Sequence, residues 1–252
     1  MSRWLALLPT LLLAATLAAA QDPVESARAL LASWHEDQAR IDRARTLLES
    51  AAAGNPAPEA LVELARAWFL TGDVRARSQA EKLAAYEQGR EAARRAVAAA
   101  PGNDMAHLWL ALNTGRYAEM RGFSTGLKML PSIREASDTA LRLNPKNVDA
   151  IVLAGGILAN VPRLMGGDRA KAEAHFKRAL ELDPHKTSAR IELADLYMDT
   201  KRWAEARQEL QRIVNETAPT DLPRWTVTEV PQARRLLVEI ANREPRPAGQ
   251  SP

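Results

Sequence analysis

The 252-residue sequence contains no cysteine, has few aromatic residues and shows no large excess of charge of either sign. Without cysteine the chain has no disulfide, no thiol nucleophile and no residue for a lipoprotein anchor. Its 34 basic and 31 acidic side chains give a net charge of +3, and no basic run is interleaved with aromatic residues. We therefore do not expect nucleic acid as a partner.

Motifs for catalysis and metal binding are also missing. The four histidines, His35, His107, His175 and His185, lack the spacing of a metal-binding pair, and no serine lies in a G-x-S-x-G turn. A Gly-Gly-Asp sequence at 166–168 precedes a helical pattern, but it lacks the Lys-Ser/Thr of a phosphate-binding loop. A structural turn with a helix cap is favoured there. We expect no enzyme activity, no cofactor and no metal.

The first twenty residues have the pattern of a secretory signal. A basic residue, Arg3, is followed by a short apolar run and by three alanines at 18–20. That run is too short to span a bilayer, so we expect cleavage after residue 20 and no transmembrane segment afterwards, although a retained anchor is the alternative. The domain would then cover 21–242, with a disordered Pro- and Gly-containing tail at 243–252. The arginine-rich, lysine-poor composition favours a bacterial source and hence the periplasm.

Residues 162–184 carry the signature of a tetratricopeptide repeat. Ala172, Phe176, Ala179 and Pro184 follow the spacing A-x3-F-x2-A-x4-P, which is typical of the second helix of that repeat. The small residues allow two antiparallel helices to approach closely, and the aromatic ring fills the space between them. The motif therefore indicates packing and not catalysis.

Similar helical patterns recur along the chain and end at prolines 56, 101, 145, 184 and 219. The sequence thus predicts an all-α fold, a tetratricopeptide-like solenoid of about five helix pairs with a C-terminal capping helix. In detail, we expect a long helix at 74–100, a loop at 123–131, a further loop at 219–231 and the capping helix at 232–242. Trp225 is expected to pack back on the array.

A mixed aromatic and polar stripe gives the candidate binding site. Trp109, Asn113 and Arg116 share one helical stripe, and Asn160 and Arg163 form a similar pair beside the turn at 162. First helices line the concave face of such a solenoid, and an arginine there suits a carboxylate. The extra residues at 122–131 and 162–167 are placed to cover one end of the site. The alternative is that Trp109 is core and Arg116 a solvated charge.

The middle of the chain resembles the TatT family, the tetratricopeptide component of some TRAP transporters, and more distantly the regulator of microtubule dynamics proteins. The resemblance covers about seventy residues by motif, from Trp109 to Leu180, and it rests on a W-x5-G-x3-E-x2-G run and on the residues that follow it. These are Trp109, Gly115, Glu119 and Gly122, then Ile133-Arg134-Glu135, Ala140-Leu141, Asn144-Pro145, Pro162-Arg163-Leu164, Gly166-Gly167-Asp168 and Phe176.

That resemblance implies a periplasmic helical protein that forms a homo-trimer and associates with the substrate-binding protein of a TRAP system. It also implies an apolar cavity in each protomer that binds a small hydrophobic or carboxylate ligand. The alternative is a general protein-protein or peptide-binding scaffold for envelope assembly, which needs an open groove instead of a closed cavity. The absence of a lipoprotein cysteine departs from many members of the family.

Overall fold

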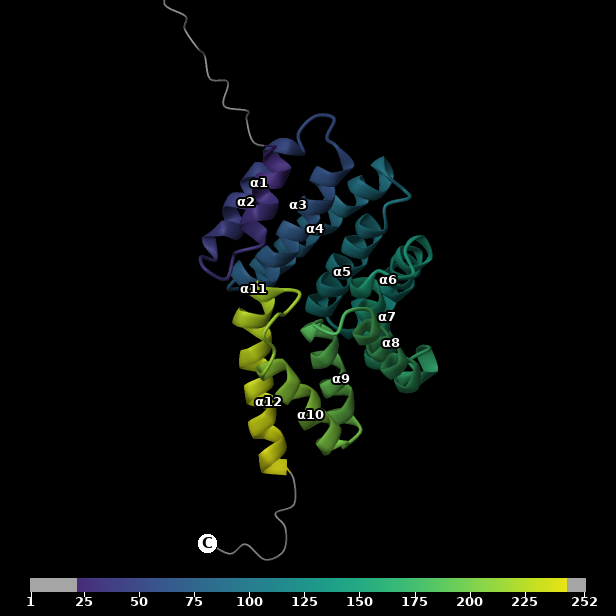
Figure 1. Ribbon diagram of the computed structural model, residues 1–252. Coiled ribbons are helices and arrows are strands. Elements are labelled where there is room, and N and C mark those ends of the chain that lie inside the picture. The colour runs from purple at the N-terminus through teal and green to yellow at the C-terminus, as the bar shows by residue number, and fades with distance from the viewer. Residues whose placement is uncertain (1–21, 244–252) are drawn as a thin grey trace, which may run out of the picture.

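The computed structural model describes residues 22–243, and these form helices joined by short connections (Figure 1). The predicted signal at 1–20 and almost all of the predicted tail lie outside the described residues. The helices are α1 Pro23–Leu31, α2 Ala39–Ala51, α3 Pro58–Leu70, α4 Gln79–Ala99, α5 Asp104–Arg121, α6 Phe123–Leu143, α7 Val148–Asn160, α8 Arg169–Leu182, α9 Thr187–Asp199, α10 Trp203–Val214, α11 Leu222–Arg224 and α12 Val230–Arg243. Shorter turns are η1 Thr71–Arg75, η2 Arg163–Met165 and η3 Trp225–Glu229.

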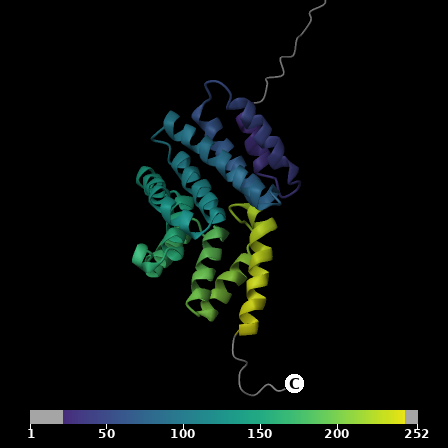
Figure 2. The same cartoon turned by 180° about the vertical axis from the view of Figure 1, so that it is seen from behind.

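Consecutive helices pack as hairpins, from the pair α1 and α2 to the pair α9 and α10, and α12 packs against α10. This arrangement confirms the predicted all-α solenoid of helix pairs that ends in a C-terminal helix. Figures 1 and 2 show the first two hairpins and α5 in one half of the molecule and α9, α10 and α12 in the other, with α6 to α8 along one side. Two main hydrophobic clusters fill these halves.

Several helices begin where side-chain caps were readable in the sequence. The Asn103 side chain accepts hydrogen bonds from the backbone N–H groups of Met105 and Ala106 at the start of α5. Asp168 accepts from Ala170 and Lys171 at the start of α8, at 3.1 and 3.0 Å. Because these contacts satisfy otherwise free N–H groups, they fix where the helices start.

The glycine turn before α8 is also confirmed. Gly166 adopts a left-handed backbone with φ of 89°, which strains any residue with a side chain. At Gly167 a Cβ atom would lie 1.7 Å from the carbonyl oxygen of Val161. Only glycine therefore fits where the chain folds back onto the end of α7.

Three predicted boundaries are wrong. Residues 123–131 are not a loop but the first part of α6, with Pro131 inside the helix and exposed to solvent, where water can satisfy the carbonyl group that loses its partner. The helix predicted from 74 starts later, at Gln79, because Ser78 and Glu81 form a capping box. The segment 219–231 is mostly helical, since Pro223 and Pro231 lie in first turns, where proline is tolerated.

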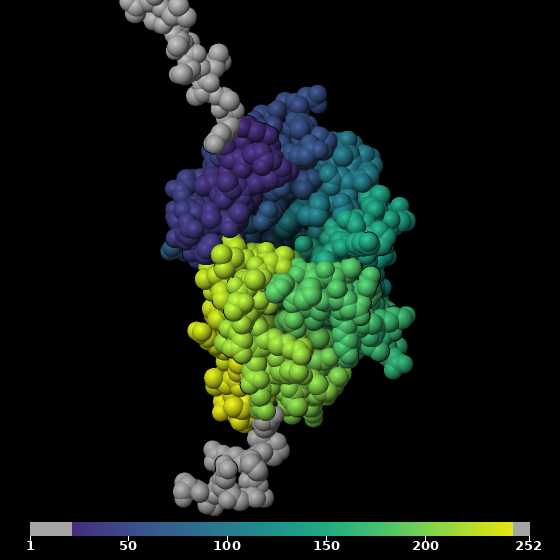
Figure 3. Space-filling view, viewed as in Figure 1, coloured from purple at the N-terminus to yellow at the C-terminus, as the bar shows by residue number. Residues whose placement is uncertain are grey.

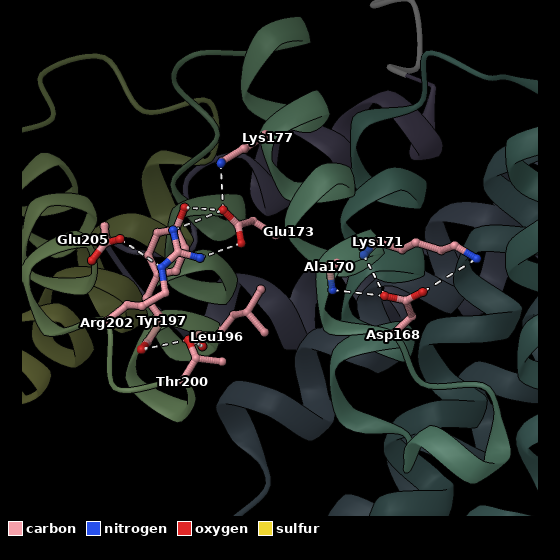
Figure 4. A network of polar contacts seen from close by, with 10 residues as sticks. All are labelled: Asp168, Ala170, Lys171, Glu173, Lys177, Leu196, Tyr197, Thr200, Arg202 and Glu205. Carbon is pink, nitrogen blue, oxygen red and sulfur yellow. Dashed lines mark hydrogen bonds and ion pairs between the residues drawn. The ribbon is translucent and has the colours of Figure 1, made fainter.

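A polar network fastens α8 to α9 and to the start of α10 (Figure 4). The Glu173 carboxylate lies 2.7 Å from the Arg202 guanidinium and 2.7 Å from the Lys177 ammonium group. It also accepts a hydrogen bond from the Tyr197 hydroxyl at 3.1 Å. Burial acts to raise the pKa of Glu173, but the hydrogen bonds from these three groups outweigh it and lower the pKa to about 2.

The acid stability of the fold should depend on Glu173. A carboxyl group with a lowered pKa in the folded state contributes stability above its unfolded pKa of 4.5, and this stability is lost as the pH falls toward 2. After allowance for solvent screening, we expect a loss of about 1 kcal/mol from this group. Urea unfolding between pH 6 and pH 2 should therefore show a steeper decline in the parent than in Glu173→Gln. Parallel declines in the two proteins would contradict this assignment.

Candidate functional site

The concave side of the solenoid encloses a cavity of about 1280 Å³. Its walls come from the first helices of the hairpins, α1, α3, α5, α7 and α9, together with the first part of α6. Residues of the C-terminal segment 219–229 line the opposite side. The cavity thus lies where the sequence placed the concave face, although it spans more of the repeats than predicted.

The C-terminal segment closes the array by contacting its beginning. Arg224 of α11 lies 3.8 Å from the Asp73 carboxylate of η1, and Val227 packs against the first hydrophobic cluster. The indole N–H of Trp225 donates to the carbonyl oxygen of Ile213 at 2.8 Å, so Trp225 packs back on the array as predicted. Figure 1 shows this yellow segment beside one end of the first hairpins, and Figure 3 shows how the two halves meet around it.

Three of the five predicted site residues line this cavity: Trp109, Arg116 and Asn160. The Trp109 ring is partly buried and tilted against Phe69, with 5.5 Å between ring centroids. Asn160 is exposed at the end of α7, where its side chain donates to the carbonyl oxygen of Gly156 at 2.9 Å. The aromatic wall is therefore present, with Asn160 at its rim.

Asn113 and Arg163 do not line the cavity. Asn113 is completely buried between α3, α4 and α5, and its amide donates to the carbonyl oxygens of Ala65 at 3.2 Å and Trp109 at 2.9 Å. Arg163 lies exposed in the η2 turn. Asn113 thus has a packing role between hairpins. Arg163 lies outside the cavity that Trp109, Arg116 and Asn160 line.

Arg116 is already neutralised by acidic neighbours. Its guanidinium lies 3.0 Å from the Glu119 carboxylate and 3.6 Å from Asp73. Asp73 also accepts a hydrogen bond from the Tyr86 hydroxyl at 2.6 Å. Burial raises the pKa of Tyr86, and the adjacent Asp73 carboxylate acts in the same direction. A carboxylate ligand would have to compete with two protein carboxylates for Arg116.

Two parts of the site were not predicted from the sequence. Glu192 of α9 lines the cavity, and so does the C-terminal segment around Arg224. Glu192 could have been predicted, because it is an acidic residue between the apolar residues Ile191 and Leu193 of a first helix. The position of Arg224 had no local signal, because its partner Asp73 is far away in the chain.

The described part of the chain contains neither a group of potential metal ligands nor a membrane-spanning helix. Within 22–243 no three histidine or acidic side chains are grouped as metal ligands. No helix in the same range has both the length and the apolar character needed to cross a bilayer.

Comparison with models of protein families shows which family the chain belongs to. Residues 24–157 match the family model described as regulator of microtubule dynamics protein 1-3, which is more than half of the sequence. The chain belongs to this family. Residues 163–226 match a tetratricopeptide repeat model. This member of the regulator of microtubule dynamics family is therefore a tetratricopeptide helical-repeat protein, a scaffold class that typically binds proteins and is typically non-catalytic.

Two curated proteins are similar to parts of the chain. The chain is 25% identical over 202 residues to regulator of microtubule dynamics protein 3 of Rattus norvegicus, covering 71% of this chain and 43% of that protein. It is 50% identical over 50 residues to a DnaJ homolog subfamily C member 7 homolog of Schizosaccharomyces pombe, covering 20% of this chain and 10% of that protein. The chain thus spans less than half the length of these curated relatives.

Among solved structures, a thermophilic tetratricopeptide protein of Thermus thermophilus superimposes with a TM-score of 0.65 at 25% identity. The match covers 88% of this chain and 98% of that protein. This family member therefore has the tetratricopeptide fold along most of its length.

Proposed function

We propose that this chain is a non-catalytic repeat protein that holds a small, largely apolar ligand inside its solenoid and docks on a protein partner. The observation that carries the proposal is the cavity of about 1280 Å³ between the first helices and the C-terminal segment. Ligand pockets in proteins usually have volumes of roughly 300–1,000 Å³ and walls that combine apolar side chains with a few polar groups. At about 1280 Å³ this cavity is larger than that range, so it has room for such a ligand, and its wall contains both apolar and polar side chains.

In its finer form, the proposal makes the chain a TatT-like component that works with a TRAP transporter. The signal pattern at 1–20 supports export to the periplasm, where the substrate-binding protein of such a system would be the partner. A cavity inside the solenoid agrees with what the resemblance to that family implies. A homo-trimer belongs to the same proposal.

The second candidate is a scaffold that binds other proteins without a small ligand. Exposed apolar side chains favour it: Leu164 is fully exposed in the η2 turn, Met165 is partly exposed beside it, and Phe123 at the start of α6 is 72% exposed. A scaffold that takes an extended peptide would use the concave face as an open groove. Here residues 219–224 and Glu229 also line the cavity, so part of the C-terminal segment borders the space that a peptide would need, which favours the small ligand.

A cavity-filling variant separates these two candidates. Gly115 lines the cavity, and a Cβ atom there would have no heavy atom within 4 Å, so Gly115→Leu should occupy the space without disturbing the helix. We expect calorimetric titration with 1-octanol, a neutral apolar probe, to show saturable binding to the parent and at least about tenfold weaker binding to Gly115→Leu. The melting temperature should not fall, because leucine favours a helix more than glycine does.

Two outcomes would contradict the proposed small-ligand function. One is the absence of saturable octanol binding to the parent protein. The other is equal octanol binding by the parent and by Gly115→Leu, since this would place the probe outside the cavity.

A further inference from the structure

The charged side chains of the cavity wall differ in whether they have a partner of opposite charge. Each of the five basic side chains lies within 4 Å of an acidic partner: Arg28 with Glu63 at 2.8 Å, Arg66 with Glu63 at 3.6 Å, Arg116 with Glu119 at 3.0 Å, Lys186 with Asp149 at 2.6 Å and Arg224 with Glu229 at 3.5 Å. Among the described lining residues, no cation is therefore left over for an anionic ligand.

The guanidinium groups of Arg116 and Arg224 share one carboxylate, and each has a second acidic partner. Arg116 and Arg224 both approach Asp73, at 3.6 and 3.8 Å, in addition to their contacts with Glu119 and Glu229. Two positive charges thus meet three carboxylates, one of which, Glu229, also accepts a hydrogen bond from the Thr187 hydroxyl at 2.5 Å. Both guanidinium groups are thus engaged by protein carboxylates, and the contact of Arg224 with Asp73 ties the C-terminal segment to the first half of the molecule.

Two acidic side chains of the wall, Glu59 and Glu192, have no partner among the described residues, and of these only Glu192 is partly buried. This residue of α9 lines the cavity, is only partly accessible, and has neither a hydrogen bond nor an ion pair within residues 22–243. Its Oε2 atom lies 3.7 Å from where a Cβ atom of Gly156 in α7 would be, so the missing side chain at Gly156 leaves room beside the carboxylate. Buried carboxylates are normally paired or hydrogen-bonded. A ligand that supplies a cation would satisfy this one.

The cavity wall also contains apolar side chains. Trp109 and Leu112 of α5, Leu130 of α6 and Ile157 of α7 line the same cavity. An apolar body placed along these residues would remove hydrophobic surface from water, and such burial is favourable in proportion to the area.

We propose that the cavity takes an organic cation, with an ammonium group bound by Glu192 and an apolar body against the wall formed by Trp109, Leu112, Leu130 and Ile157. This inference rests on the proposed function, namely that the cavity holds a small ligand. It replaces the carboxylate class of ligand with the opposite charge, because Arg116 is engaged by protein carboxylates and Glu192 is not.

The electrostatics of Glu192 agree with this assignment. Burial raises the pKa of Glu192, the nearby Asp195 acts in the same direction, and the guanidinium groups of Arg116 and Arg224 act against it. The charged form is thus disfavoured while the cavity holds no cation. An ammonium group in hydrogen-bond contact favours the charged form and gains a charge-assisted bond, which is stronger than a neutral one.

Three probes with one apolar body test the proposal at pH 7: octylammonium, 1-octanol and octanoate. In calorimetric titrations we expect octylammonium to bind the parent at least about tenfold more tightly than octanol, and octanoate to bind more weakly than octanol. Glu192→Gln keeps the shape but removes the charge, so it should bind octylammonium and octanol about equally while retaining the octanol affinity of the parent.

Glu59→Gln is the matched control, because Glu59 also lines the cavity but is exposed to solvent. It should keep the preference of the parent for octylammonium. Octanoate binding at least as tightly as octylammonium would overturn the inference, and so would a preference for octylammonium that survives in Glu192→Gln. If octanol binds in the cavity but the cation preference is absent, the small-ligand function stands and only the ligand class is wrong.

Discussion

Replacing Phe176 with alanine should lower the free energy of unfolding by about 3–5 kcal/mol, as is typical of a phenylalanine removed from a core. The Phe176 side chain is completely buried in the second hydrophobic cluster. A Cβ atom on Gly155 of α7 would lie 2.6 Å from its ring, so the ring fills the space that this glycine leaves open. Alanine would leave a cavity between α7 and α8 that two packed helices cannot close.

The control is Phe123→Ala, which makes the same chemical change at a side chain that is 72% exposed. Its effect on the free energy of unfolding should stay within about 0.5 kcal/mol, since exposed side chains contribute little. Urea unfolding followed by circular dichroism measures both variants. Similar losses in Phe176→Ala and Phe123→Ala would show that the ring of Phe176 does not have the packing role assigned to it.

The second large effect is expected at Gly89, where α4 approaches α5. A Cβ atom there would lie 2.1 Å from the Oδ1 atom of Asn113. Asn113 cannot easily move away, because its amide is buried and bonded to two backbone carbonyl groups, those of Ala65 and Trp109. We expect Gly89→Val to lower the free energy of unfolding by about 2–3 kcal/mol, through overpacking and through disturbed hydrogen bonds of a buried amide.

Gly115→Val tests whether this loss comes from the close approach and not from valine itself. Gly115 also lies inside a helix, but a Cβ atom there would meet no heavy atom within 4 Å. The control should therefore be neutral or slightly more stable than the parent, because glycine is a poor helix former. A chemical denaturation series on the two variants decides the matter. Equal destabilisation would mean that the approach of α4 to Asn113 carries no special constraint.

Much of the fold could be predicted from local patterns. Asp168 caps a helix where the sequence placed a cap, and Ala172, Phe176 and Ala179 are completely buried as their repeat spacing predicts. These features depend on residues close together in the chain, whose contacts follow from helical geometry. The loop predicted at 123–131 is wrong because α6 continues through Pro131, which lies on the exposed side of the helix.

The site was harder to predict, because it depends on how distant hairpins meet. Trp109, Arg116 and Asn160 do line one cavity, so the concave face was placed correctly. Helical spacing put Asn113 on the same stripe, but it could not show that the side chain turns into the contact with Gly89. The closure by Arg224 and Asp73 joins two ends of the array, and the curvature of the whole solenoid sets that distance.

A structure of the protein with octylammonium bound would show directly whether the cavity holds an organic cation. We expect the probe inside the solenoid, with its ammonium group within hydrogen-bond distance of Glu192 and its chain along Trp109 and Leu112. Residues 219–224 should still border the cavity. A probe bound on the outer surface, or with its ammonium group directed away from Glu192, would contradict the proposal.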